Sequence, residues 1–317
     1  MNQSEETGGV ALFGAGGAIG HVLARELDRE SISYRVVGRN VERLKKDFPN
    51  AEAASADFFS GEGVAGAAKG IDTVFYLAGA PYTEFEKHPV MVRHALDGAQ
   101  AAGVRRFVHV APVYSYGPAL ATPVSESQPH RPETKKGRYR LEQEQAVLER
   151  NGPELATLVV HLPDFYGPHA DLSYANAFMR EALAGKTASF VGPLNVKREF
   201  IYVPDAAAPL LQLASLDDAY GRCWNLGGQE IGAQTFVDTV YSTLRTKPKM
   251  RSVSKFMLQT IGIGVPFMRE VAEMYYLFEG GFILDDSALR RHLGDYSKTS
   301  FADGIATTIE WMKATPT

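Results

Sequence analysis

The sequence has a single cysteine, no long apolar run and no excess of basic side chains. Cys223 is the only cysteine in 317 residues, which excludes an internal disulfide and a metal site with several cysteine ligands. A single thiol fits a reducing compartment, so we expect a cytoplasmic protein. Lys and Arg number 33 against 37 Asp and Glu, giving a formal net charge of -4. Because nucleic-acid binding requires basic side chains to displace counterions, we expect no nucleic-acid partner.

No uninterrupted apolar segment reaches the ~18 residues that are needed to cross a bilayer. The nearest candidate spans residues 256–284, and Arg269, Glu270 and Glu273 interrupt it. We interpret this segment as helices folded over a site, with a membrane-surface role as the alternative. Residues 1–9 are polar and acidic, unlike a secretory or mitochondrial signal. We therefore expect no membrane partner.

Short β-rich runs alternate with helical patterns over the first two-thirds of the chain. Apolar runs that predict strands lie at 10–13, 34–37, 73–77, 107–110 and 158–162. Between them, segments such as 21–30 and 90–102 have apolar residues three and four apart, which predicts helices. This alternation predicts an α/β fold, a Rossmann-type doubly wound parallel sheet with helices on both faces.

The alternation ends near Pro168. We predict a dinucleotide-binding domain at 1–170, completed by 200–227, and a smaller, mostly helical substrate-binding lobe at 171–199 and 228–317. Ligands of open α/β sheets bind at the carboxyl ends of the strands, so we expect the two parts to share a cleft there.

A glycine-rich turn directly follows the first predicted strand and precedes a helix. Gly14 permits the tight turn, Gly17 lets the backbone approach a pyrophosphate, and Gly20 lets the helix pack on the strand. Ala18 and Ile19 open the helix, whose free N–H groups and dipole favour phosphate. A purely structural glycine turn is the alternative.

The residues after the second predicted strand indicate which dinucleotide binds. NAD sites carry an acidic residue here, whereas this chain has Gly38 followed by Arg39 and Asn40. An arginine suits the additional phosphate of NADP(H), which we favour over NAD(H). The alternative is that Arg39 is a solvated loop residue. Asp57, with Phe58, is predicted to lie beside the adenine.

Five motifs in order resemble those of the extended branch of the short-chain dehydrogenase/reductase superfamily, the NAD-dependent epimerase/dehydratase-like proteins. They lie at 13–20, 72–79, 103–108, 163–168 and 198–205, over nearly the whole chain. The resemblance implies the same fold and a nicotinamide dinucleotide. It also implies further cofactor contacts from Leu77, Ala78, Gly79, Val110, Lys136, Pro163 and Phe165.

The family's catalytic residues are absent at the matching positions. The catalytic serine is replaced by Pro112, the tyrosine by Lys136 and the lysine by Arg140. Lys136 and Arg140 share a helix face, so Arg140 could bind the nicotinamide ribose while its charge lowers the pKa of Lys136. Lys136 would then be a general acid or an amine that attacks a carbonyl, and Tyr114 is the second candidate donor. The alternative is a solvated Lys136 at the helix start.

These observations favour an NADP(H)-dependent oxidoreductase that reduces a small carbonyl, enone or sugar-like substrate. Two alternatives remain: a non-catalytic NADP(H) sensor, and an epimerase or lyase that uses its cofactor transiently. The sequence contains no metalloprotease or serine-hydrolase motif and no Cys/His cluster, so we expect no metal. The family resemblance implies a homodimer through 90–102 and 137–150.

Overall fold

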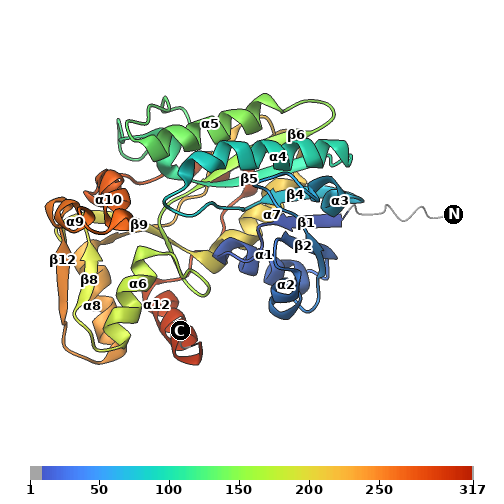
Figure 1. Cartoon of the computed structure of the whole chain (residues 1–317). Helices are drawn as coiled ribbons and strands as arrows, with labels where there is room; N and C mark the ends of the chain where they lie inside the picture. Colours follow the sequence, from blue (N-terminus) through green and yellow to red (C-terminus); the bar gives the residue numbers. More distant parts are fainter. Residues whose placement is uncertain (1–8, 316–317) are drawn as a thin grey trace.

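Seven parallel strands form the central sheet of the computed structural model, which describes residues 9–315 (Figure 1). The strands lie in the order β10-β6-β5-β4-β1-β2-β3. Their bounds are β1 Gly9–Phe13, β2 Tyr34–Gly38, β3 Glu52–Ser55, β4 Ile71–Tyr76, β5 Arg106–Pro112, β6 Ala156–Leu162 and β10 Cys223–Asn225. The predicted α/β doubly wound fold is confirmed. The expectation that residues 1–9 are not a targeting signal falls, except for Gly9, outside the described residues.

Helices cover both faces of this sheet because its strands are apolar on both sides. In β1, Ala11 and Phe13 belong to one buried cluster and Leu12 to the other, as the alternation of side chains in a strand requires. The Leu12 face is covered by α1 (Ala18–Arg29), α2 (Val41–Asp47) and α7 (Ala207–Ser215). The Phe13 face is covered by α3 (Val64–Ala68), α4 (His88–Ala101) and α5 (Lys135–Glu149).

A smaller part of the molecule has its own apolar core, which includes Phe178, Phe236 and Ile305. It contains the helices α6 (Tyr174–Leu183), α8 (Ala233–Leu244) and α12 (Phe301–Ala314). It also holds two small sheets, β11-β9-β7 and β12-β8, which the sequence analysis had not foreseen as sheets. Their strands are β7 Phe165–Tyr166, β8 Ala188–Val191, β9 Lys197–Tyr202, β11 Gln229–Gly232 and β12 Met250–Val253. Of the segment 200–227, β10 joins the central sheet, whereas β9 pairs with β7 and β11.

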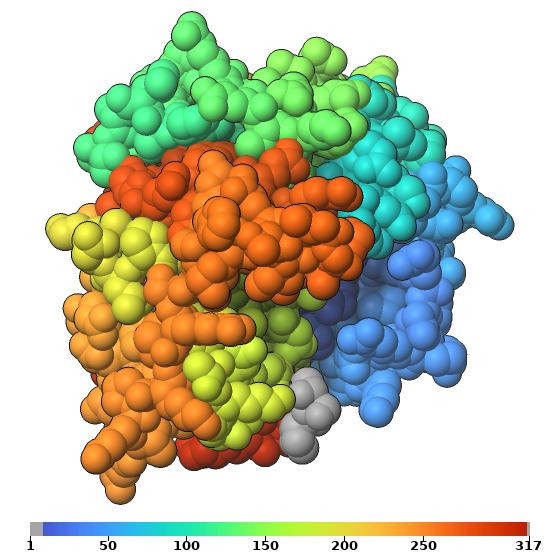
Figure 2. Space-filling model, turned by 60° about the vertical axis from the view of Figure 1, so that its left-hand side comes forward, coloured from blue at the N-terminus to red at the C-terminus, as the bar shows by residue number. Residues whose placement is uncertain are grey.

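The largely apolar segment 256–284 lies in two helices and a turn. These are α9 (Lys255–Gly262), α10 (Pro266–Glu273) and the 3-10 turn η5 (Tyr275–Phe278), and α11 (Ser287–Leu293) follows them. Figure 2 shows α9 and α10 in orange, next to the green helix region of α5, with a hollow between them and the blue N-terminal part. Within residues 9–315, no helix is both long and apolar enough to span a membrane.

Candidate functional site

The glycine turn leaves an open helix terminus at the carboxyl edge of the sheet. Gly14 has φ +85°, and a Cβ there would lie 2.6 Å from the Cα of Ala78. A Cβ on Gly20 would overlap the carbonyl oxygen of Ala15, so α1 packs against its own turn only with glycine. Gly17 begins α1 with open space around it and no side-chain cap. Free N–H groups beside open space suit an anionic ligand.

The other residues expected at the cofactor lie at the same edge, after neighbouring parallel strands. Leu77 donates its N–H to the carbonyl of Phe13 over 2.8 Å, which joins the ends of β4 and β1. Ala18 and Ile19 are half-exposed in the first turn of α1. The set is completed by Ala78 and Gly79 after β4, Val110 in β5, Pro163 after β6 and Phe165 in β7.

The edge beside β2 presents an arginine that has no acidic partner among residues 9–315. Arg39 is exposed, with its guanidinium carbon 5.2 Å from the centre of the Phe59 ring, and no acidic residue in the described chain pairs with it. The Asn40 side chain instead accepts from the N–H of Arg43 over 2.9 Å and caps α2. Arg39 is thus the residue available to a phosphate here.

Asp57 and Phe58 are held in local structure. The Asp57 carboxylate accepts from the N–H of Phe59 over 3.0 Å and from the hydroxyl of Ser60 over 3.4 Å, which closes a turn. Phe58 is buried against Phe13, with ring centroids 5.2 Å apart. The side chain of Phe58 therefore faces the apolar core.

Lys136 is buried in the first turn of α5, where only 2% of it is exposed. Its ammonium donates to the carboxylates of Glu270 and Glu273, at 2.9 Å from Glu273 Oε2, and both acids belong to α10. Its N–H donates to Glu273 Oε1 over 3.2 Å. Although burial opposes it, the hydrogen bonds from Lys136 hold the pKa of Glu273 below its usual value. The lysine is thus an ion-paired buried residue and does not lie in solvent.

The two carboxylates bring negative charge to Lys136, whereas Arg140 brings positive charge. From the sequence, only the positive charge of Arg140 was expected near the lysine. Opposite charges within hydrogen-bond distance favour the charged form of a side chain. The structure therefore pairs Lys136 with two carboxylates, an arrangement that suits a proton donor and not an attacking amine.

Arg140 follows one turn later and has no acidic partner in the described part of the chain. Its Nη1 donates to Gln143 Oε1 over 2.7 Å, while its Nε is buried without a protein partner. Burial lowers the pKa of Arg140 to about 10, and it remains charged at neutral pH. Buried neighbouring polar atoms also lack a protein partner, namely the Tyr76 hydroxyl and His109 Nε2. Unpaired buried donors cost ~1–3 kcal/mol each, so this position favours a polar ligand.

The ring of Phe85, in the 3-10 turn η1 (Phe85–Lys87), contacts all three catalytic candidates. Its centre lies 5.5 Å from Lys136 Nζ, 5.0 Å from the guanidinium carbon of Arg140 and 6.2 Å from the Tyr114 ring centre. Burial raises the pKa of Tyr114 to about 12, which keeps its hydroxyl protonated. A Cβ on Gly137 would lie 2.8 Å from the Tyr114 carbonyl oxygen, so this glycine lets α5 approach the turn that carries Tyr114.

Sequence reasoning missed the acids that complete this site. Glu270 and Glu273 are three residues apart on an amphipathic helix, a spacing that places both on one face. In the sequence they had appeared only as interruptions of an apolar run. A second missed pair joins Asp164, after β6, to Arg198 of β9 over 2.6 Å. Arg198 is 5% exposed, so its charge is already matched within the protein.

A family model for the NAD dependent epimerase/dehydratase family matches residues 10–227. This match covers more than half of the chain, and the chain therefore belongs to that family.

Similar proteins of known structure share the fold. The UDP-glucose 4-epimerase of Mycolicibacterium smegmatis is 26% identical over 225 residues, which is 68% of this chain and 65% of that protein. The chain thus spans less than two-thirds of the length of this relative. The solved structure of MoeE5 in complex with UDP-glucose and NAD has a TM-score of 0.80 at 23% identity, covering 98% of this chain and 100% of that chain. UDP-glucuronic acid 4-epimerase from Bacillus cereus, in complex with NAD, has a TM-score of 0.78 at 15% identity, covering 96% and 99%.

Proposed function

We propose that this protein is an NADP(H)-dependent oxidoreductase in which Lys136 handles the proton on the substrate oxygen. The observation that carries the proposal is the buried ammonium of Lys136, fixed beside Arg140 where relatives of the family place tyrosine and lysine. The epimerase or lyase that uses its cofactor transiently is a second candidate, because a UDP-glucose 4-epimerase is among the relatives.

The residues at the sheet edge fit a nicotinamide dinucleotide. The open helix start at Gly17 suits the pyrophosphate, and unpaired Arg39 suits the additional phosphate of NADP(H). Arg140, which has an unpartnered Nε and no acidic partner among the described residues, suits the hydroxyls of the nicotinamide ribose. Structural relatives were solved with NAD, so NADH is the necessary comparison in any binding test.

The chemistry divides between the cofactor and the protein. Bound NADP(H) would supply or accept a hydride at the substrate carbon. The Lys136 ammonium then donates a proton to the substrate oxygen as the alcohol forms, and becomes an amine. Glu270 and Glu273, with side chains 25% and 23% exposed, reach solvent and can return a proton to that amine. Tyr114, protonated and buried nearby, is the alternative donor.

Aromatic side chains around Lys136 favour a small carbonyl or enone substrate. The ring centres of Tyr82 and Phe85 lie 5.0 Å and 5.5 Å from Lys136 Nζ. MoeE5 was solved with UDP-glucose, so a sugar-like substrate stands in this proposal beside carbonyl and enone compounds.

The decisive experiment compares Lys136→Met with Lys135→Met in NADPH oxidation over a panel of carbonyl and enone compounds. Lys135 is the exposed neighbour on the same turn and serves as the control. We expect Lys136→Met to lose about 100-fold or more in turnover while NADPH binding changes little. Equal turnover in both variants would refute the role of Lys136. Product formation without net NADPH consumption would identify the epimerase or lyase. NADPH binding without any turnover would identify the non-catalytic sensor.

We also propose a substrate-binding lobe at 171–199 and 228–317. From the single cysteine, we propose a cytoplasmic location.

A homodimer through α4 and α5 is a further part of the proposal. In the structure α4 and α5 lie side by side, joined by the ion pairs Arg93–Glu142 and Arg150–Asp97. Light scattering after size-exclusion chromatography tests the dimer, because a monomer at all concentrations would contradict it.

A further inference from the structure

A second group of polar side chains meets further along α5. Glu144 lies eight residues after Lys136, about 12 Å further along the helix. Glu144 of α5, His161 of β6 and Cys223 of β10 each offer a ligand atom, and these three atoms lie within 4.8 Å of one another. Glu144 is 4% exposed and His161 is fully buried, so three separate elements bring polar groups into the protein interior.

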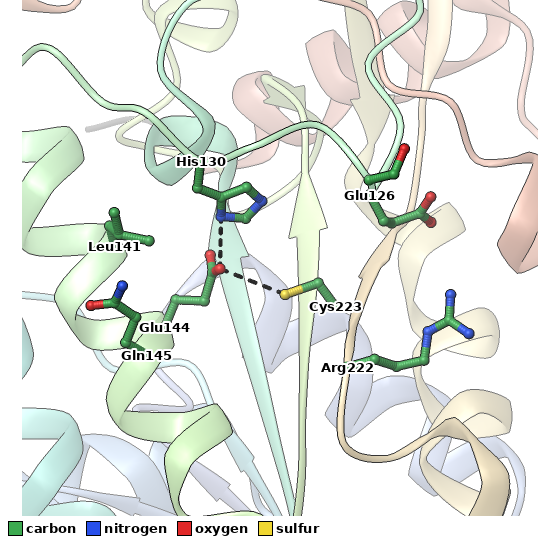
Figure 3. Close-up of a pocket in the computed structure, with 8 residues that line it drawn as sticks. Glu126, His130, Leu141, Glu144, Gln145, Arg222 and Cys223 are labelled. Carbon is green, nitrogen blue, oxygen red and sulfur yellow. Dashed lines mark hydrogen bonds and ion pairs between the residues drawn. The ribbon is translucent and has the colours of Figure 1, made fainter.

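The Glu144 carboxylate is the centre of this cluster. Glu144 Oε2 lies 2.9 Å from His161 Nε2, and Oε1 lies 3.6 Å from Cys223 Sγ. His130 Nδ1 lies 2.7 Å from the same Oε1. In Figure 3, His130 from the loop before α5 and Cys223 both point at the carboxylate of Glu144.

The arrangement does not suit a nucleophilic serine. The Ser115 hydroxyl lies 3.2 Å from His161 Nε2, the ring nitrogen that also faces Glu144. A serine–histidine–acid relay needs the hydroxyl and the carboxylate on different ring nitrogens. His161 Nδ1 is buried and has no protein partner.

The donor atoms of the cluster suit a cation. A carboxylate oxygen, an imidazole nitrogen and a thiol sulfur face one another within 4.8 Å. A divalent cation placed between them would replace the thiol proton, which leaves to solvent, and would remove the repulsion between thiolate and carboxylate.

We propose that Glu144, His161 and Cys223 bind Zn²⁺, with His130 orienting the carboxylate. A mixed set of oxygen, nitrogen and sulfur donors is typical of zinc. Tetrahedral zinc with bonds of about 2.0–2.3 Å places its ligand atoms roughly 3.3–3.8 Å apart, within the span of this cluster. A cavity of about 510 Å³ opens beside Glu144 and Cys223, which gives the ion access and leaves a fourth position to water. Bound zinc would tie α5, which carries Lys136, to β6 and β10.

The test adds Zn²⁺ to chelator-treated full-length protein in a calorimetric titration and Co²⁺ in an absorbance titration. We expect one equivalent to bind, with a thiolate-to-cobalt charge-transfer band. Because Cys223 is the only cysteine, that band can come from no other residue. Absence of zinc binding by the wild-type protein, or cobalt binding without the band, would overturn the proposal.

The variants separate the site from adventitious binding. Cys223→Ser, a nearly isosteric change, is expected to abolish the cobalt band and weaken zinc binding by about 100-fold or more, and His130→Asn to weaken it by about 10–100-fold. Glu142→Gln is the matched control, because Glu142 lies on the same helix but is exposed and pairs with Arg93 over 2.9 Å. Far-UV circular dichroism verifies that Cys223→Ser is folded. Equal zinc affinity in wild type and Cys223→Ser would overturn the assignment, since the thiolate is one of its ligands.

Discussion

Replacing Lys136 by methionine removes an ammonium that two carboxylates share and keeps the side-chain volume against Tyr82 and Phe85. Taking one partner from a buried ion pair costs ~3–5 kcal/mol, because it leaves an uncompensated charge. Here the acids left behind, Glu270 and Glu273, are about a quarter exposed and can be hydrated. We therefore expect Lys136→Met to lower the free energy of unfolding by about 2–3 kcal/mol at pH 7.

The loss of unfolding free energy in Lys136→Met should become smaller as the pH falls. In the wild type the pKa of Glu273 is held below its usual 4.5, so the stability it contributes is present above about pH 4.5 and is lost on acidification through the lower folded pKa. In Lys136→Met, Glu273 loses the hydrogen bonds that lower its pKa and keeps the burial that raises it, so its pKa rises above that of the unfolded chain. The variant should therefore regain stability relative to wild type as the pH falls from 7 to 5.

Urea unfolding followed by far-UV circular dichroism measures both effects, with Lys135→Met as the exposed control. The triple variant Lys136→Met/Glu270→Gln/Glu273→Gln should recover most of the loss, because no charge remains unpaired. A loss in Lys136→Met no larger than the ±0.5 kcal/mol expected for Lys135→Met would refute the buried ion-pair reasoning.

Three further outcomes follow from the structure. Gly20→Ala should reduce soluble, folded protein, judged by thermal unfolding, since its Cβ would overlap the Ala15 carbonyl oxygen; an unchanged midpoint would contradict this. Arg140→Met should weaken NADPH binding about 10-fold, ~1.4 kcal/mol in a calorimetric titration, whereas unaltered affinity would remove Arg140 from the cofactor site. Burial raises the pKa of Glu199 to about 7, so the free energy of unfolding should fall between pH 5 and 7 by up to ~1.4 kcal/mol per unit, and Glu199→Gln should flatten that slope.

Local patterns were sufficient for the sheet and its glycine turn. The run 10–13, its glycines and the helix after them are contiguous in sequence, and strand periodicity and backbone sterics act over such short distances. The predicted strands accordingly appear as β1, β2, β4, β5 and β6. The exposure of the Arg39 side chain also follows from its place directly after a strand.

The surroundings of Lys136 could not be predicted in the same way. Glu270 and Glu273 lie more than 130 residues from Lys136 and reach it only because α10 folds over the start of α5. The cluster of Glu144, His161 and Cys223 has the same origin, since three elements far apart in sequence meet at one point. Single-sequence periodicity contains no information on such tertiary contacts, so this cluster could not be recognised from the sequence.

A calorimetric titration of the purified protein with NADPH and with NADH, repeated on Arg39→Ala, tests the cofactor assignment most directly. We predict that NADPH binds more tightly than NADH, and that Arg39→Ala weakens NADPH binding about 10-fold while leaving NADH binding unchanged. Equal affinity for both cofactors would contradict the role of Arg39. Failure to bind either one would mean that the glycine turn is structural and that the proposed oxidoreductase function is wrong.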